Sequence, residues 1–353
     1  MAFTYYTPFV VAAAQVPSAQ TNFPALILVT DNRFRTIANG GNVADANGYD
    51  IRPYASDGVT ARTYELVPGT YVATTGAFEM WVLVPSIDVG TEIRLYYGDA
   101  ALSSDGSSTS TWNSNFKAVY HLGTASTISL VDSTSNANTL TNTNTTPATA
   151  GQMSGAAAFN GATNSRRLSK TAPVSTVTTN FTMLAWVKPN AVTQFGMIVS
   201  NGNDDSLNGF GFEHSVSGGS GTHFVALIQG VARKDSGYAF PDTTSWHRIV
   251  CANDAGTWRP YVDGVAQTTS ATSTEATPTS AFAIGSLNPA SRYYDGSVDE
   301  VQVIDAVVGA NWITTDFNNQ SAPTTFWPTG TETAVGGGTA AATLGRLPLT
   351  GVQ

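Results

Sequence analysis

Short apolar runs, separated by clusters of Gly, Pro, Asn and Ser, recur along most of the chain. In the first third they are ALILVT (25–30), FEMWVLVP (78–85) and TEIRLYYGD (91–99). Runs of this length, rich in β-branched and aromatic residues, are typical of strands bounded by turns. One segment interrupts them: DNRFRTIANGG (31–41) predicts a short helix that ends at Gly40-Gly41.

The same pattern continues at closer spacing from residue 116 onwards. The runs are AAAFN (156–160), FTMLAWVKP (181–189), FGMIVSNG (195–202), FGFEHSV (210–216), HFVALIQG (223–230), WHRIVCAND (246–254), TWRPYVDGV (257–265), AFAIGS (281–286) and GSVDEVQVID (296–305). Asp263-Gly264 is a two-residue hairpin signal, and only Asn311–Asn319 indicates a brief helix after the last strand. Many short strands with almost no helix predict an all-β fold built as two-sheet sandwiches.

Six of these segments resemble a known family in their order: FTMLAWVKP, IVSNG, WHRIV, YVDG, AIGS and GSVDEVQV. They are similar to the laminin-G-like branch of the concanavalin A-like lectin/glucanase superfamily, which implies a jelly roll. The segments FPALILVTD, IANGG and WVLVPSIDVGTEIRLYYGD resemble a small β-sandwich domain of unknown function that often precedes such modules. We therefore predict a β-sandwich domain over residues 1–115 and a jelly-roll domain over residues 116–322.

Residues 323–353 differ from both predicted domains. They carry Gly336-Gly337-Gly338 among Thr and Ala, together with Pro323, Pro328 and Pro348. Proline disfavours helix and favours an extended path. This composition predicts an extended C-terminal arm that contacts another protein.

The composition restricts the class of partner. The formal net charge is −9 and charged residues make up 12% of the chain, with no basic run, so nucleic acid is an unsuitable partner. No apolar run reaches the length of about 20 residues that a membrane span requires. Cys251 is the only cysteine, which rules out an intramolecular disulfide and indicates a small buried apolar side chain.

The candidate carboxylates do not have the spacing of a glycosidase. Hydrolases of the resembled superfamily hold two glutamates on one strand face, whereas the nearest match here is Asp295, Asp299 and Glu300. Asp299 and Glu300 are adjacent and are therefore expected on opposite faces of a strand. The four histidines, His121, His214, His223 and His247, lack the spacing of a zinc site. We predict a protein that is not an enzyme.

Calcium is the one cofactor that the resemblance suggests. Asp132 lies in VDSTSNANT (131–139), which resembles a calcium-binding loop of the family, and Asn136, Asn160 and Asp299 lie in segments that converge in that fold. Hard oxygen ligands of this kind suit Ca²⁺. The alternative is that Asp299 only accepts hydrogen bonds from a loop backbone.

Three aromatic residues are candidates for binding glycans. Tyr293 and Tyr294 precede a turn, and Trp258 lies near another turn. Sugar rings stack on exposed aromatic faces of this kind. The alternative is that all three belong to the core or to an interface.

Together these features suggest a virion structural protein of a tailed bacteriophage. It would decorate the capsid or belong to the tail, adhere to host surface glycans, contact other virion proteins through residues 323–353, and occur as a homo-oligomer or in many copies. The first residues, MAFTYYTPFVVAAAQ, lack the positively charged region of a signal peptide, which leads us to expect release by lysis. The alternative is a glycan-binding module that a bacterium secretes or displays on its surface, and a hydrolase is a third, weaker hypothesis.

Overall fold

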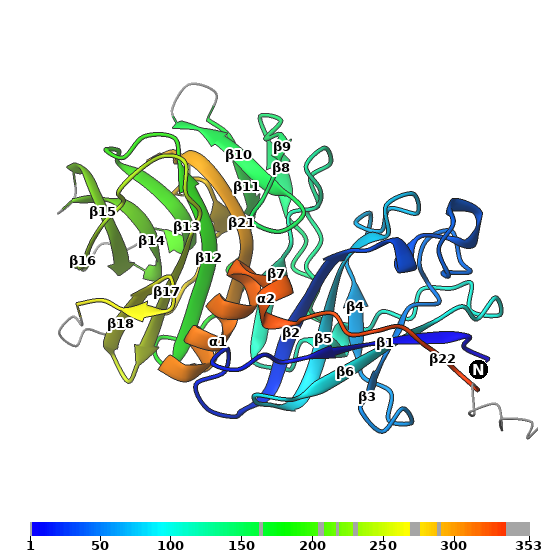
Figure 1. Ribbon diagram of the computed structural model, residues 1–353. Helices are drawn as coiled ribbons and strands as arrows, with labels where there is room; N and C mark the ends of the chain where they lie inside the picture. The colour runs from blue at the N-terminus through cyan, green and yellow to red at the C-terminus, as the bar shows by residue number, and fades with distance from the viewer. Residues whose placement is uncertain are drawn as a thin grey trace, which may run out of the picture.

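A computed structural model gives the arrangement of two β-sandwich bodies that lie side by side (Figure 1). It describes residues 2–161, 165–203, 208–216, 219–228, 232–268, 276–287 and 291–336. Almost all described elements are strands, so the predicted all-β class and the jelly roll are confirmed. Within these ranges, no helix is long and apolar enough to cross a membrane.

The N-terminal domain packs a three-stranded sheet against a four-stranded sheet. The first sheet has the order β2 (Gln20–Thr30), β5 (Ala77–Ile87), β4 (Tyr64–Leu66), and the second has the order β22 (Thr333–Ala334), β1 (Tyr5–Val10), β6 (Glu92–Tyr97), β3 (Arg52–Ala55). Phe34 lies in the core between Phe78 and Tyr97, with ring centroids 5.1 and 5.0 Å away. The helix predicted over residues 31–41 is two 3₁₀ turns, η1 (Asn32–Phe34) and η2 (Ile37–Asn39), and Gly40 ends the second at φ 80°. A third turn, η3 (Thr109–Thr111), precedes the second domain.

The second domain is a sandwich of two larger sheets. The seven-stranded sheet has the order β16 (Ala232–Ala239), β15 (Gly219–Ile228), β14 (Asn208–Val216), β13 (Gly196–Asn203), β20 (Phe282–Ile284), β11 (Arg167–Lys170), β8 (Thr141–Thr143). The eight-stranded sheet has the order β19 (Val265–Ala266), β18 (Thr257–Val262), β17 (His247–Asp254), β12 (Phe181–Pro189), β21 (Asp295–Ile304), β10 (Ala156–Asn160), β9 (Ala148–Thr149), and β7 (Phe116–Tyr120) also pairs with β21. Phe181 and Phe210 stack across the two sheets with centroids 3.8 Å apart. Alternating apolar residues on the two inner faces thus form the predicted jelly-roll core.

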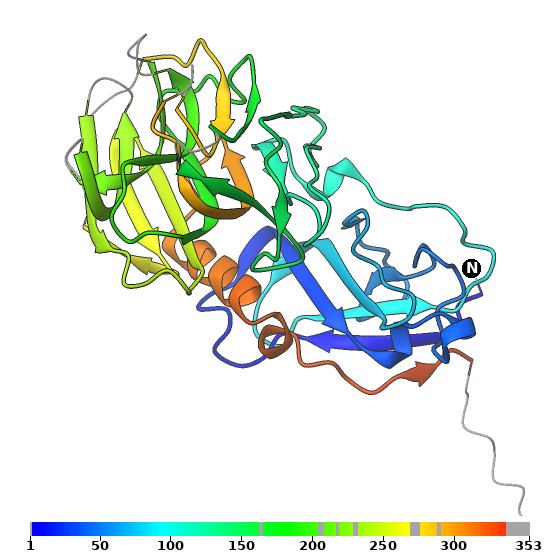
Figure 2. The same cartoon turned by 90° about the horizontal axis from the view of Figure 1, so that it is seen from above.

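The last described segment joins the two domains. After β21, helix α1 (Ala310–Ser321) lies between the domains, and α2 (Pro323–Phe326) leads back along the N-terminal domain (Figure 2). The side chain of Asn319 accepts from Leu26 N at 2.7 Å and donates to Leu26 O at 2.9 Å. On the other side, Trp186 Nε1 donates to Gln320 Oε1 at 2.7 Å. Helix α1 is therefore hydrogen-bonded to a strand of each domain.

The structure corrects the predicted arm in part. Phe326 and Trp327 are buried in the N-terminal core, and Trp327 Nε1 donates to Leu26 O at 2.9 Å. Strand β22 then pairs with the side of β1 that would otherwise be an unpaired edge, and so completes the four-stranded sheet. Two large aromatic residues and an unpaired sheet edge explain why this stretch folds back on its own chain. Residues 337–353, the rest of the predicted arm, lie outside the described residues.

Candidate functional site

A β-bulge in the central strand of the jelly roll shapes the candidate site. Leu184 on β12 pairs with Gln302 on β21, whereas Trp186 pairs with Asp299, so β21 carries one extra residue between these pairs. Glu300 lies at the bulge with a backbone φ of 44°, which is unusual for a residue other than glycine. The bulge interrupts the strict alternation of side chains from which we expected Asp299 and Glu300 on opposite faces of the strand. Both carboxylates are instead fully buried and lie close enough for the charge of Glu300 to act on Asp299.

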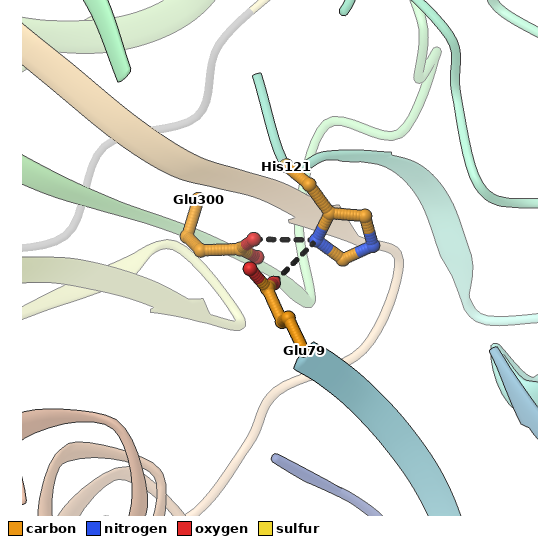
Figure 3. Close-up of side chains that lie close together, drawn as sticks. All are labelled: Glu79, His121 and Glu300. Atoms are coloured by element: carbon orange, nitrogen blue, oxygen red, sulfur yellow. Dashed lines mark hydrogen bonds and ion pairs between the residues drawn. The ribbon is translucent and has the colours of Figure 1, made fainter. Parts of the chain in front are cut away.

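Three side chains from the two domains meet beside this bulge. Glu79 comes from β5 of the N-terminal domain, Glu300 from β21, and His121 follows β7 (Figure 3). His121 Nδ1 is hydrogen-bonded to Glu300 Oε1 and lies 3.9 Å from Glu79 Oε1. One ligating atom from each of the three lies within 4.8 Å of the others, and all three residues are buried. Glu300 Oε2 has no hydrogen-bond partner among the described residues.

A surrounding layer of polar groups fixes these side chains. On the other edge of the imidazole, His121 Nε2 lies 3.3 Å from Glu65 Oε2. Glu65 also accepts from Trp112 Nε1 at 2.7 Å. Glu79 accepts from Trp81 Nε1 at 3.1 Å and from Ser154 Oγ at 2.5 Å. The carboxylates of Glu65 and Glu79 are therefore each held in one orientation.

Burial and mutual repulsion shift the acid–base properties of the site. Burial, followed by the charge of Glu300, raises the pKa of Glu79 to about 7. Burial and the charge of Glu300 also raise the pKa of Asp299 well above its usual value. Burial alone would lower the pKa of His121, but the charges of Glu300 and Glu65 raise it well above the usual range. The imidazole is thus held as a cation among carboxylates.

Solvent approaches this cluster through a pocket at the domain junction. The pocket has a volume of about 230 Å³, and its lining includes Glu65, His121, Pro68 and Ser133. It exposes the Glu65 edge of the imidazole ring, whereas Glu79 and Glu300 lie on the buried edge. Water and small ions can therefore reach Glu65 and the Nε2 edge of His121, whereas Glu79 and Glu300 do not line the pocket and a sugar ring cannot contact Glu300.

The structure brings only two of the four predicted calcium ligands together. Asp132 accepts from Val119 N and Thr134 N at 3.0 Å and from Asn138 N at 2.8 Å, while Asn136 bonds to the hydroxyl of the same Thr134.

Asp299 lies elsewhere and accepts from Met153 N at 3.1 Å and Glu300 N at 2.7 Å. Gly151 permits this close packing, because a Cβ there would stand 2.5 Å from Asp299 Oδ2. Asn160 pairs with Asp295 across β10 and β21, and its Oδ1 is buried without a partner in the described residues. The two carboxylates would have to give up backbone hydrogen bonds to bind calcium, so they do not fit such a site well.

Two of the three predicted glycan-binding aromatics are in the core. Tyr294 is 0% exposed and Trp258 is 1% exposed. Trp258 packs edge-on against Phe181, with centroids 5.5 Å apart. Trp258 lies on β18 and Tyr294 directly precedes β21, and both side chains belong to the apolar core of the jelly roll. Tyr293 is half-buried and remains available.

No pattern in the sequence predicts that Glu79, His121 and Glu300 form a cluster. The spacing of the histidines predicts no zinc site at His121, and no sequence pattern singles out Glu65 or Glu79. A signal was present at Glu79, because a carboxylate inside the apolar run FEMWVLVP requires a buried partner. The partner, however, comes from the other domain.

A family comparison agrees with the fold of the second domain. Residues 160–314 match the family model Laminin_G_3, described as the Concanavalin A-like lectin/glucanases superfamily. The second body is therefore a concanavalin A-like, lectin-like jelly-roll domain. No curated protein matches the chain.

Several solved structures are similar in fold at low identity. Domain 4 of AbnA, an extracellular arabinanase from Geobacillus stearothermophilus solved in complex with arabinotriose, has 18% identity and a TM-score of 0.47, with 58% of this chain and 98% of that chain covered. The botulinum neurotoxin serotype G binding domain has 14% identity and a TM-score of 0.41, covering 54% and 49%. A Trypanosoma rangeli sialidase with the inhibitor DANA has 13% identity and a TM-score of 0.43, covering 76% and 43%. The chain thus spans about half the length of the neurotoxin binding domain and less of the sialidase.

Proposed function

We propose that this protein is a non-enzymatic, carbohydrate-binding structural protein that is displayed in many copies on the particle of a tailed bacteriophage. The observation that carries the binding role is the match of residues 160–314 to a lectin-like family. The low content of charged residues, 12%, is compatible with a particle surface covered by Ser, Thr and Asn. A secreted or surface-displayed bacterial glycan-binding module is the second candidate, and the same family match supports it.

A half-buried group around Phe195 is the surface best suited to a sugar. The guanidinium of Arg292 lies 4.9 Å from the centroid of the Phe195 ring, and that of Arg233 lies 5.9 Å away. Tyr293 follows Arg292 directly and forms a bridge with Met197 at the end of β13. Aromatic faces beside planar hydrogen-bond donors are the groups with which proteins hold sugar rings.

Burial of the carboxylates supports a role without catalysis. Asp299 and Glu300 have no exposed surface, and Glu79 of the N-terminal domain lies beside Glu300. A glycosidase needs two carboxyl groups that reach both sides of a bound sugar. Because this pair cannot contact a polysaccharide, we expect no release of reducing sugar by the purified protein.

A glycan array probed with monomer and with a multivalent display of the same chain tests the binding role. We expect weak monomer binding that strengthens strongly on multivalent display, because many linked sites raise the effective concentration. Tyr293→Ala should remove the signal. Tyr6→Ala, a half-buried tyrosine of the N-terminal domain, is the matched control and should keep it. Equal loss in both variants, or no binding in either format, contradicts the proposal.

Calcium in the loop of Asp132 and Asn136 is a separate prediction, since Asn160 and Asp299 have other neighbours. If calcium binds there, added Ca²⁺ should raise the melting temperature of the wild type and not that of Asp132→Ala. An unchanged melting curve in Ca²⁺ would leave the hydrogen bonds of Asp132 and Asp299 as their whole role.

The particle role has its own test. Mass spectrometry of purified phage particles should detect the chain, and electron cryo-microscopy should show repeated copies of the two-domain body. A secreted bacterial module would instead appear in culture supernatant or on cells that carry no phage genes. Detection there alone would favour the second candidate.

A further inference from the structure

The buried charges at the domain junction are not balanced. Four carboxylates lie there, those of Glu65, Glu79, Asp299 and Glu300, and among the described residues His121 is the only cationic side chain that pairs with any of them. The nearby guanidinium of Arg248 pairs with a fifth carboxylate, Asp316, at 2.9 Å. Buried carboxylates without partners are costly, so such a cluster needs protons or a bound cation.

Both the candidate ligands and the groups that are hydrogen-bonded to them are arranged as in a metal site. Metal-binding histidines usually donate their second ring N–H to a carboxylate, and here His121 Nε2 faces Glu65 Oε2 at 3.3 Å. Ligating carboxylates are in turn hydrogen-bonded, as Glu79 is by Trp81 and Ser154. Glu300 adds an independent sign of a ligand, because its Oε2 is fully buried without a partner in the described part of the chain.

We infer that Glu79, His121 and Glu300 bind one divalent cation of the zinc type, which ties the N-terminal domain to the jelly roll. Two ligands that each lie about 2.0–2.2 Å from such an ion are roughly 3–4 Å apart. His121 Nδ1 and Glu79 Oε1, 3.9 Å apart, already meet this. The ion would replace the proton that His121 Nδ1 shares with Glu300, so this proton is released to solvent and the two side chains separate slightly. One imidazole with two carboxylates suits Zn²⁺ or Mn²⁺ better than Ca²⁺, which prefers oxygen ligands alone.

The site lies where a cation would affect the assembly of the molecule. Glu79 belongs to β5 of the N-terminal domain and the other two ligands to the second domain, so the ion would bridge the two domains. The pocket that reaches Glu65 and His121 provides a route for the ion from solvent. The inference does not depend on the proposed glycan binding, which concerns the opposite sheet of the jelly roll.

The test measures metal in the full-length protein. After EDTA treatment and dialysis, titration of the wild type with ZnCl₂ should show one equivalent bound, and metal analysis by mass spectrometry should confirm it. Glu79→Gln and Glu300→Gln should each lose that equivalent. Glu65→Gln acts through the histidine and should weaken binding by about 10–100-fold without abolishing it. Glu92→Gln removes a partly exposed carboxylate on β6 that pairs with Arg94, and this matched control should bind as the wild type does.

A second measurement keeps the test independent of variant folding. Wild-type apoprotein loaded with Co²⁺ should show the visible absorption of a site with nitrogen and oxygen ligands, and Zn²⁺ should displace it. Zinc should also raise the melting temperature of the wild type. If the folded wild type binds none of Zn²⁺, Mn²⁺ and Co²⁺, the inference is overturned. Protons on the buried carboxylates would then neutralise their charge. Uptake that Glu79→Gln and Glu300→Gln retain would place the ion elsewhere.

Discussion

The interior of the jelly roll and the junction between the two domains are both buried, but they are stabilised in different ways. The jelly-roll interior is apolar, with Phe181 and Phe210 stacked between its sheets. The junction contains Glu79, His121 and Glu300, whose burial is tolerated only through specific polar partners. Loss of a core side chain therefore creates a cavity, whereas loss of one junction side chain leaves a charge without its partner. A second mutation that also removes the partner should therefore restore stability at the junction but not in the apolar core.

The largest expected effect is at the apolar core. Phe210→Ala should lower the free energy of unfolding by about 3–5 kcal/mol, because it removes buried surface and leaves a cavity. Denaturant unfolding followed by tryptophan fluorescence measures this. Val265→Ala, an exposed apolar residue, should change stability by less than about 0.5 kcal/mol. If Phe210→Ala lowers the free energy of unfolding no more than Val265→Ala does, the core must repack to fill the space of the removed ring.

The junction should respond differently when both partners of a charge pair are replaced. Asp316→Leu alone should cost about 3–5 kcal/mol, because it leaves the guanidinium of Arg248 buried and unpaired. The double variant Arg248→Met, Asp316→Leu should recover most of that loss. A double-mutant cycle in urea measures the coupling. Additive losses would mean that the junction behaves like the apolar core.

His214 provides a pH-dependent test inside the jelly roll. Burial lowers the pKa of His214 to about 4, and its Nε2 lies 2.9 Å from Val192 O. The unfolded chain takes up a proton near pH 6.5 but the folded chain does not, so stability is full above about pH 6.5 and falls as the pH drops towards 4. This contribution reaches at most about 3 kcal/mol.

The difference between the wild type and His214→Gln isolates that contribution. Unfolding curves at pH 7, 6, 5 and 4 should show the two proteins converge or cross as the pH falls. Val265→Ala, which replaces an exposed side chain that carries no titrating group, is the control and should follow the wild type throughout. A difference that stays constant with pH would contradict the assignment.

The smallest effect is expected for the end of the chain. Removal of residues 337–353 keeps Phe326, Trp327 and β22, so stability should change by less than about 0.5 kcal/mol. Removal of everything after Ala322 takes these elements away and should destabilise the N-terminal domain strongly. If residues 337–353 contact another virion protein, the shorter truncation should fold normally but fail to enter particles, which electrophoresis of purified particles measures.

The sequence by itself determined the class of fold and most of the strands. Apolar runs such as FTMLAWVKP and turn signals such as Asp263-Gly264 act over a few neighbouring residues, so they can be recognised locally. The order of six segments was enough to indicate the jelly roll. The aromatic residues Trp258 and Tyr294 were misassigned because turn proximity does not reveal which side of a strand faces the opposite sheet.

Only the tertiary structure decided the junction. The bulge at Glu300 is a matter of register between β12 and β21, and strict alternation in the sequence cannot show it. Glu79 and His121 meet because the N-terminal domain packs on the eight-stranded sheet. Helix α1 and strand β22 stabilise this packing through their hydrogen bonds to β2 and β1. Contacts between residues so far apart depend on how whole sheets pack, and local propensity carries no information about that packing.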